Sequence, residues 1–238
     1  MKTIFTGLGG TVAPVVADYF TAHKHTIKRY DRDVVGTEDY GRIKTFLETE
    51  SPDMFLHFAL GDAEWAEMLA QACKTMNIKF IYISTVSVYG DHQVGPFTPN
   101  VIPEPSSDYG KYKLECEVRV KKANPDTTII RIGWQIGTRP GSNNMIDYLD
   151  KQMKQYGVVK ASTQFYPSAS FLDVTAKAIY DIAGLSPDLY HVNSNLDKSF
   201  YDIVNILKSD HPFIKVEKTD KPQLDHRMED SRLTIERI

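Results

Sequence analysis

Cysteine, long apolar runs and signal-like segments are scarce in this sequence or missing from it. The 238 residues include only two cysteines, Cys73 and Cys116, which lie far apart in stretches with helical spacing. Neither they nor the seven histidines show a metal-ligand spacing, so we expect reduced thiols and no metal site. No segment approaches the roughly 20 apolar residues of a membrane span, and glycine follows too soon for a secretory signal. These absences predict a cytoplasmic protein.

The sequence also lacks a run of lysine and arginine residues, and its formal net charge is −3. A protein that binds a nucleic-acid backbone or an anionic membrane surface usually carries a basic patch. We therefore expect a small-molecule partner, with no nucleic acid and no membrane. Hydrophobic content of 42% and charged content of 25% suit one sizeable core, or a core with a small second lobe.

The first 22 residues predict a strand, a tight turn and a helix. Residues 3–6 are β-prone, glycines dominate 7–10, and residues 11–22 carry apolar side chains at helical spacing. Glycines let backbone N–H groups and a helix N-terminus approach a phosphate without an intervening Cβ. Gly7 and Gly10 fit this use, so the segment is typical of a dinucleotide-binding loop.

A second strand is predicted over residues 25–30 and ends at two residues of opposite charge. Asp31 stands about 20 residues after the glycines, where a carboxylate can bind the adenosine ribose. Arg32 follows it directly and could instead accept a 2′-phosphate. The two neighbours therefore favour NAD and NADP respectively, and the residues alone leave both open.

From residue 40 onward, strands alternate with helices. The patterns predict helices over 40–50 and 63–76, and strands over 54–58, 78–84 and 128–132. This order predicts an α/β fold with a doubly wound parallel sheet of the Rossmann type, in which ligands bind at the carboxyl ends of the strands. We assign residues 1–135 mainly to an NAD(P)-binding domain.

Residues 136–238 are predicted to form mainly a small C-terminal substrate-binding lobe, with chain segments interleaved between the two parts. Helices are predicted over 145–156, 173–182 and 199–207, and a strand over 189–192. We place residues 158–159, the 164–171 loop and the 173–182 helix in a lobe that covers the cleft.

Chemically useful side chains follow the strand at 78–84. Ser84, Thr85 and Ser87 stand where a substrate is expected, although hydroxyls are also common at ordinary strand ends. Tyr109 and Lys113 follow capping residues that predict a helix beginning near residue 108, so both lie on one helix face. A nearby ammonium lowers the pKa of a phenol from about 10 and lets it shuttle a proton. Taken alone, the pair is more often a chance neighbour pair on a solvated face.

Other charged residues are open to two interpretations. Arg131, at the end of a predicted strand, is either a clamp for a phosphate or carboxylate or a partner of an acid within the protein. Glu115 and Glu117 stand beside basic residues on the predicted helix after residue 108, and we expect them on its solvated face.

Several motifs occur in an order that resembles a known family. They are Thr6-Gly7-Leu8-Gly9-Gly10, Ser84-Thr85-Val86-Ser87-Val88-Tyr89-Gly90, Tyr109-Gly110-Lys111-Tyr112-Lys113 and Ile130-Arg131-Ile132-Gly133-Trp134. With them the chain resembles the extended short-chain dehydrogenase/reductases over almost its whole length, and within these the dTDP-4-dehydrorhamnose reductase-like group. The resemblance implies an NAD(P)-dependent oxidoreductase that reduces or epimerises a keto group of a nucleotide sugar. The oligomeric state stays open, with a homodimer as one alternative.

The resemblance also assigns roles to single residues. Tyr109 looks like the acid/base, Lys113 like its electrostatic partner and a ligand of the nicotinamide ribose, and Thr85 like the hydroxyl that polarises the substrate carbonyl. Besides this set, the implied contacts to NADP or NAD come from Gly7, Leu8, Gly9, Gly10, Thr11, Val12, Asp31, Arg32, Phe58, Ala59 and Leu60. The implied substrate contacts are Ser87, Arg131, Trp134 and Arg227.

The chain departs from the family pattern on the substrate side. After Ala59, relatives carry a longer loop, whereas here Asp62 leads almost directly into a helix. Ser87 replaces an aromatic residue, Ser168 a proline, and Met228 the proline after the family's closing arginine. These changes keep an alternative open, in which the protein is a non-catalytic NAD(P)-binding regulatory subunit or sensor. The Thr85, Tyr109 and Lys113 set favours the enzyme, because a binding module needs no proton donor.

Overall fold

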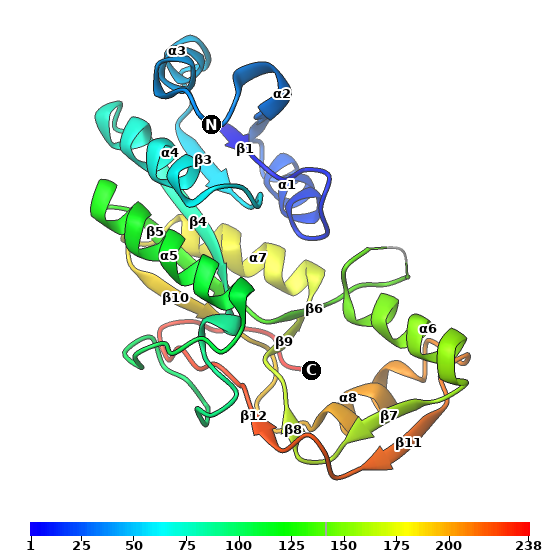
Figure 1. Ribbon diagram of the computed structural model, residues 1–238. Helices are drawn as coiled ribbons and strands as arrows, with labels where there is room; N and C mark the ends of the chain where they lie inside the picture. The colour runs from blue at the N-terminus through cyan, green and yellow to red at the C-terminus, as the bar shows by residue number, and fades with distance from the viewer. Residues whose placement is uncertain (141) are drawn as a thin grey trace.

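The computed structural model describes residues 1–140 and 142–238 and is built around a six-stranded sheet with the order β10-β5-β4-β3-β1-β2 (Figure 1). Every neighbouring pair of strands in this sheet is parallel. The strands are β1 (Lys2–Phe5), β2 (Thr26–Arg29), β3 (Met54–His57), β4 (Lys79–Thr85), β5 (Thr128–Ile132) and β10 (Leu189–Val192). The predicted α/β fold of the Rossmann type is confirmed.

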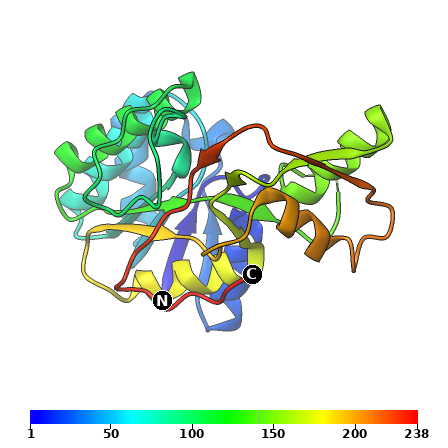
Figure 2. The ribbon, with the colours of Figure 1, turned by 90° about the horizontal axis from the view of Figure 1, so that it is seen from below.

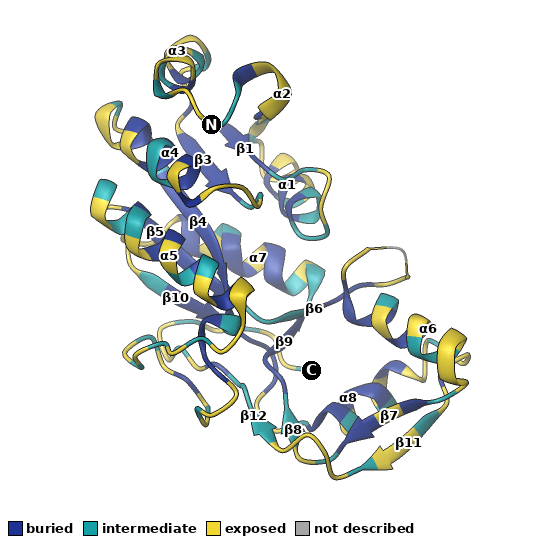
Figure 3. Cartoon of the chain, in the orientation of Figure 1, coloured by how far each residue is buried: buried dark blue, intermediate teal, exposed yellow. Residues whose placement is uncertain are grey.

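Helices cover both faces of the sheet (Figure 2). Strand residues alternate between two cores: Phe55 of β3 packs with Trp65, whereas the next residue, Leu56, packs with Val16. Because both faces are covered, the inner strands β3 and β4 are nearly continuous buried runs, whereas the edge strand β2 is mostly exposed. Figure 3 shows the sheet as mostly buried. One face carries α3 (Tyr40–Glu50), α4 (Ala63–Thr75) and α5 (Asp108–Ala123), and the other α1 (Ala13–Ala22) and α7 (Leu172–Ala183).

The position of α7 corrects one prediction. The 173–182 segment does not cover the cleft as part of a small lobe but packs beside α1 under the sheet, with the ring of Tyr180 against those of Tyr19 and Phe20. The strand that follows, β10, pairs with β5 in the same sheet. The helical spacing of apolar residues predicts a buried face but not the element that buries it.

A smaller lobe with its own core stands beside the sheet (Figure 1). Its core joins two helices and three short parallel strand pairs, including residues such as Leu149, Val159 and Ile203. The helices are α6 (Met145–Tyr156) and α8 (Phe200–Leu207). The pairs are β6 (Trp134–Ile136) with β9 (Ala169–Phe171), β7 (Val159–Ser162) with β11 (Val216–Thr219), and β8 (Phe165–Tyr166) with β12 (Leu224–Asp225).

The chain passes from the sheet to the lobe at Gly133, between β5 and β6. A Cβ at this position would clash with the backbone carbonyl of Ser168, so only glycine allows β6 to lie this close to β9. Because α7 and β10 return to the sheet, the lobe comprises two separate segments. The division at residues 135 and 136 as a functional boundary stays a prediction.

Candidate active site

Two neighbouring cavities open at the carboxyl ends of the strands and share part of their lining. One has a volume of about 560 Å³ and the other about 510 Å³, and both are lined by Gly7, Gly10, Phe58 and Leu60. The first extends toward β4, α5 and the lobe, and the second toward the end of β2. All predicted cofactor-binding residues line one cavity or both: Gly7, Leu8, Gly9, Gly10, Thr11, Val12, Asp31, Arg32, Phe58, Ala59, Leu60, Tyr109 and Lys113.

The loop between β1 and α1 fits a dinucleotide pyrophosphate. Gly7 has φ +76°, and a Cβ there would lie 3.0 Å from Phe58 Cβ, whereas a Cβ at Gly9 would meet nothing within 4 Å. The loop is held against β3 because Thr6 Oγ1 accepts hydrogen bonds from the backbone N–H groups of Phe58 and Ala59 at 2.9 and 3.0 Å. No side chain caps the N-terminus of α1. Its first N–H groups therefore remain available to an anion.

The second cavity ends among charged residues at the carboxyl end of β2. The Asp31 carboxylate accepts a hydrogen bond from the backbone N–H of Asp33 at 3.0 Å and so caps the short helix α2 (Arg32–Val35). Arg29 and Arg32 also line this cavity, and both are exposed. Neither has an ion-pair partner within residues 1–140 and 142–238. At this end of the cavity the Asp31 carboxylate is thus occupied by the helix cap, whereas the guanidinium groups of Arg29 and Arg32 remain open to a ligand.

Thr85 and Tyr109 meet in the first cavity. Thr85 ends β4, and its hydroxyl caps the 3₁₀ turn η1 (Val86–Val88) by accepting from the backbone N–H of Ser87 at 3.1 Å. Tyr109 is in the first turn of α5, which begins at Asp108 as predicted and is capped by the hydroxyl of Ser107. Burial raises the pKa of Tyr109, and the Thr85 hydroxyl beside it opposes that shift. The expectation that Lys113 lowers the pKa of Tyr109 is therefore wrong.

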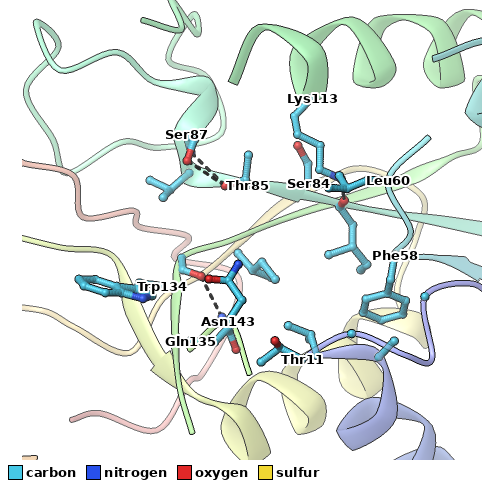
Figure 4. Close-up of a pocket in the computed structure, with 18 of the residues that line it drawn as sticks. Thr11, Phe58, Leu60, Ser84, Thr85, Ser87, Lys113, Trp134, Gln135 and Asn143 are labelled. Atoms are coloured by element: carbon cyan, nitrogen blue, oxygen red, sulfur yellow. Dashed lines mark hydrogen bonds between the residues drawn. The ribbon is translucent and has the colours of Figure 1, made fainter. Parts of the chain in front are cut away.

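Lys113 is turned toward the sheet and is only 3% exposed. Its ammonium donates hydrogen bonds to the Ile83 carbonyl at 2.7 Å and to the Tyr82 hydroxyl at 3.2 Å, and it lies over the Tyr82 ring. Figure 4 shows it reaching from α5 toward Ser84 and Leu60. Burial lowers the pKa of Lys113 to about 8, with Cys116 and Glu117 opposing the shift. The ammonium therefore anchors α5 to β4 at the cavity wall.

The predicted substrate contacts divide into two pairs. Ser87 and Trp134 line the first cavity (Figure 4). Arg131 and Arg227 do not line it, and each forms an ion pair with an acid of the protein. Arg227 binds Asp225 at 2.5 Å and lies over the ring of Tyr166.

Arg131 belongs to a buried ion pair with Glu117. The distances from its Nη2 and Nε to the carboxylate are 2.6 and 2.9 Å, and its Nη1 donates to the Tyr89 hydroxyl at 2.7 Å. The prediction of a solvated Glu117 is wrong, because this residue faces the sheet and also accepts a hydrogen bond from Ser84. The structure thus favours the internal partner for Arg131. Glu115 does stand in a more exposed position, where it pairs with Arg119.

Sequence reasoning missed several residues of the first cavity. The sequence pattern places Ser84 only in a hydroxyl cluster and singles out neither Gln135 nor Asn143. A polar residue between Trp134 and Ile136 was the available signal for Gln135, because it interrupts an apolar strand that leaves the sheet at its carboxyl end. For Asn143, in the loop before α6, the sequence offered no comparable signal.

Comparisons with known proteins agree with this architecture. The chain is 22% identical over 184 residues to the Bacillus subtilis spore coat polysaccharide biosynthesis protein SpsK, covering 77% of this chain and 63% of that protein. It is 27% identical over 163 residues to a dTDP-4-dehydrorhamnose reductase of Mycolicibacterium smegmatis, covering 60% and 48%. The chain thus spans less than two thirds of these curated relatives.

A solved structure and a family model extend the match. The crystal structure of a Bacillus anthracis dTDP-4-dehydrorhamnose reductase in complex with NADP superposes with a TM-score of 0.86 at 17% identity, covering 99% of this chain and 95% of that one. This likeness shows the fold. The family model described as the RmlD substrate binding domain matches residues 61–238, which is most of the chain. The protein is therefore a member of the RmlD substrate-binding-domain family, within the extended short-chain dehydrogenase/reductases.

Proposed function

We propose that the protein is an NAD(P)-dependent oxidoreductase that reduces, or epimerises through a keto intermediate, a nucleotide sugar. One observation carries the proposal: Thr85, Tyr109 and Lys113 come from two elements to one cavity that continues into the glycine cradle. A non-catalytic binding module has no use for a proton donor at this position. The Mycolicibacterium relative, named a dTDP-4-dehydrorhamnose reductase, supports a nucleotide sugar as the substrate class.

The residues of the site divide the chemistry among them. When bound, the cofactor supplies or accepts the hydride. In this proposal Thr85 turns its O–H from Ser87 Oγ to the carbonyl oxygen, and Tyr109 donates to the same oxygen and then gives its proton to the developing alkoxide. Its raised pKa keeps the phenol protonated, as an acid must be. We assign Lys113 to the nicotinamide ribose, because its ammonium keeps one N–H beyond those donated to the Ile83 carbonyl and the Tyr82 hydroxyl. In the oxidation step of an epimerisation, the proton would pass in reverse, from the sugar hydroxyl to Tyr109.

The charges at the end of the second cavity support NADP over NAD. Arg29 and Arg32 line it without ion-pair partners in the described part of the chain, and guanidinium groups bind phosphate well. The Asp31 carboxylate, which would favour the free 2′-hydroxyl of NAD, is engaged in capping α2. The Bacillus anthracis structure contains NADP. We expect NADPH to bind more tightly than NADH in calorimetric titrations.

Replacing Tyr109 with phenylalanine tests the proposed function. The Tyr109→Phe variant removes the proton donor and keeps the ring, so turnover should fall by about two to four orders of magnitude. Its affinity for NADPH should stay within about twofold of the wild type. Tyr40→Phe is a matched control, because Tyr40 stands on α3 and lines neither cavity.

Activity is measured as NADPH oxidation with a panel of keto sugars linked to dTDP, UDP or GDP. Wild-type protein that binds NADPH but turns over no member would support the regulatory subunit or sensor instead. Unchanged activity of Tyr109→Phe would contradict the role of the phenol.

The proposal extends to a cytoplasmic homodimer. No helix in the described part of the chain is long and apolar enough to cross a membrane. Both cysteines are free and buried, which suits a reducing compartment. Val118, 61% exposed on the outer side of α5, offers an apolar contact for a second copy. Sedimentation velocity of the wild type would give the oligomeric state.

A further inference from the structure

Gln135 places an unused hydrogen-bond acceptor in the wall of the first cavity. The residue lies in the middle of β6 and is only 5% exposed. Its side-chain oxygen is buried and has no hydrogen-bond partner within residues 1–140 and 142–238. Figure 4 shows the side chain on the wall opposite Lys113 and Ser84. Gln135 therefore lines the same cavity as Thr85 and Tyr109.

The orientation of this amide is fixed by its other end. Nε2 of Gln135 donates a hydrogen bond to the Gly133 carbonyl at 3.0 Å. A flipped amide would put two acceptor oxygens against each other, so the oxygen must point away from Gly133. Buried polar atoms in native proteins are nearly always paired, because leaving one unpaired lowers stability. The Gln135 oxygen is thus available to accept a hydrogen bond from a bound molecule.

The strand that carries Gln135 belongs to the lobe rather than to the cofactor cradle. Trp134, just before it, stacks on Phe200 of α8 at 5.5 Å between ring centroids, and Ile136, just after it, is in the lobe core. The glycine cradle is instead built by the β1–α1 loop and the end of β3. A donor near Gln135 therefore belongs to the substrate.

We propose that Gln135 determines substrate specificity by accepting a hydrogen bond from a hydroxyl group of the sugar. This inference rests on the proposed function, because it requires a nucleotide sugar in the first cavity. The amide N–H is engaged, so the residue selects a donor and discriminates against a sugar that carries no hydroxyl at that ring position.

The test compares Gln135→Met with Gln155→Met, a matched change at an exposed glutamine of α6 that lines neither cavity. Calorimetry measures binding of dTDP-, UDP- and GDP-glucose to the NADP-saturated proteins, and then of monodeoxy analogues of the sugar nucleotide that binds best. Gln135→Met should raise the Kd of that sugar nucleotide about tenfold, as expected for the loss of one hydrogen bond. Gln155→Met should leave this Kd unchanged. For one monodeoxy analogue, the wild type should show an affinity about tenfold lower than for the parent sugar nucleotide. Gln135→Met should bind this analogue and the parent sugar nucleotide with equal affinity.

A second readout separates positioning from a general structural defect. In steady-state kinetics Gln135→Met should raise the KM of the keto sugar more than it lowers kcat. The NADP Kd should stay unchanged, and the melting temperature should not fall, because the variant removes an unpaired buried acceptor. Equal binding of all analogues by both proteins would overturn the assignment and leave the proposed function standing. A loss of NADP affinity in Gln135→Met without sugar would also overturn it, because the acceptor would then serve the cofactor. Wild-type protein that binds no nucleotide sugar would overturn the proposed function and this inference together.

Discussion

Lys113 carries a positive charge at a place where charge is unfavourable. The side chain is buried against β4, and burial lowers its pKa from the ordinary 10.5 to about 8. Its neighbours are a carbonyl, a phenol and a thiol rather than a carboxylate in direct contact. The charge is therefore full near neutral pH and is lost within a few pH units above it.

This pKa predicts an alkaline limit to activity. The ammonium is protonated below about pH 8 and neutral above it, whereas the raised pKa of Tyr109 keeps the phenol protonated through the same range. The value of kcat/KM for NADPH, which reports groups of the free enzyme, should therefore fall above about pH 8. The Kd of NADP, measured by calorimetry over the same range, should rise in parallel.

Lys113→Arg tests whether Lys113 causes this fall of kcat/KM above about pH 8. Arginine stays charged, so the fall of kcat/KM should move to a higher pH while some activity remains. If kcat/KM of this variant still falls near pH 8, another group causes the fall. If the variant does not fold, the pH dependence of NADP binding to the wild type still decides, because a flat profile between pH 7 and about 9.5 contradicts a role for the ammonium.

At the scale of elements, the site depends on the contact between α5 and the turn after β4. The Ser107 hydroxyl accepts the backbone N–H of Gly110 at 3.1 Å and starts the helix, and Gly110 then meets the carbonyl of Ser87. This contact sets how close Tyr109 comes to Thr85. The glycine in the Tyr109-to-Lys113 motif is thus needed for packing between elements, since its own backbone is helical.

Gly110→Ala should separate these two elements. The added Cβ would overlap the Ser87 carbonyl oxygen, a backbone atom that cannot rotate away. Overpacking of this kind costs about 1–3 kcal/mol in the free energy of unfolding. We expect kcat to fall by at least about tenfold because Tyr109 moves with the helix, measured beside urea unfolding. Lys111→Ala, at an exposed neighbouring position, is the control and should change both quantities little.

At the scale of the whole molecule, the sequence predicts what depends on local pattern. The glycine turn, the alternation of strands and helices and the start of α5 follow from spacing and capping residues, and the structure has them. The long-range partners do not follow. The pairing of Glu117 with Arg131 requires knowing which face of α5 meets β5, and periodicity alone does not name the neighbour.

The lobe shows the same limit. Its strands are two to four residues long and pair in parallel across long stretches of chain, for example β7 with β11. Such short segments carry too few alternating positions to predict a strand. The pattern does not predict Gln135 as a site residue for this reason, since β6 has three residues and its partner β9 is more than 30 residues further along the chain. The cofactor end of the site is therefore predictable, and the substrate end is not.

Two buried histidines at different points of the sheet predict acid sensitivity of the whole fold. Burial lowers the pKa of His57, on β3, to about 3, and that of His191, on β10, to about 4. Both pKa values are ordinarily near 6.5, so between pH 6.5 and about 4 the unfolded chain binds more protons than the native one. Stability therefore rises with pH in this window and is lost as pH falls through it. The direction is the same for both residues.

The slope of this loss can be measured. Near pH 5, two extra protons in the unfolded state correspond to about 2.7 kcal/mol of unfolding free energy per pH unit, which urea titrations at several pH values detect. His191→Gln should remove about half of that slope, whereas His92→Gln, at an exposed position, should leave it unchanged. An unchanged slope in His191→Gln would show that His191 takes up its proton in the native state. The sheet would then tolerate a charge beside Arg131, and the buried polar network between α5 and β10 would be better solvated than its geometry indicates.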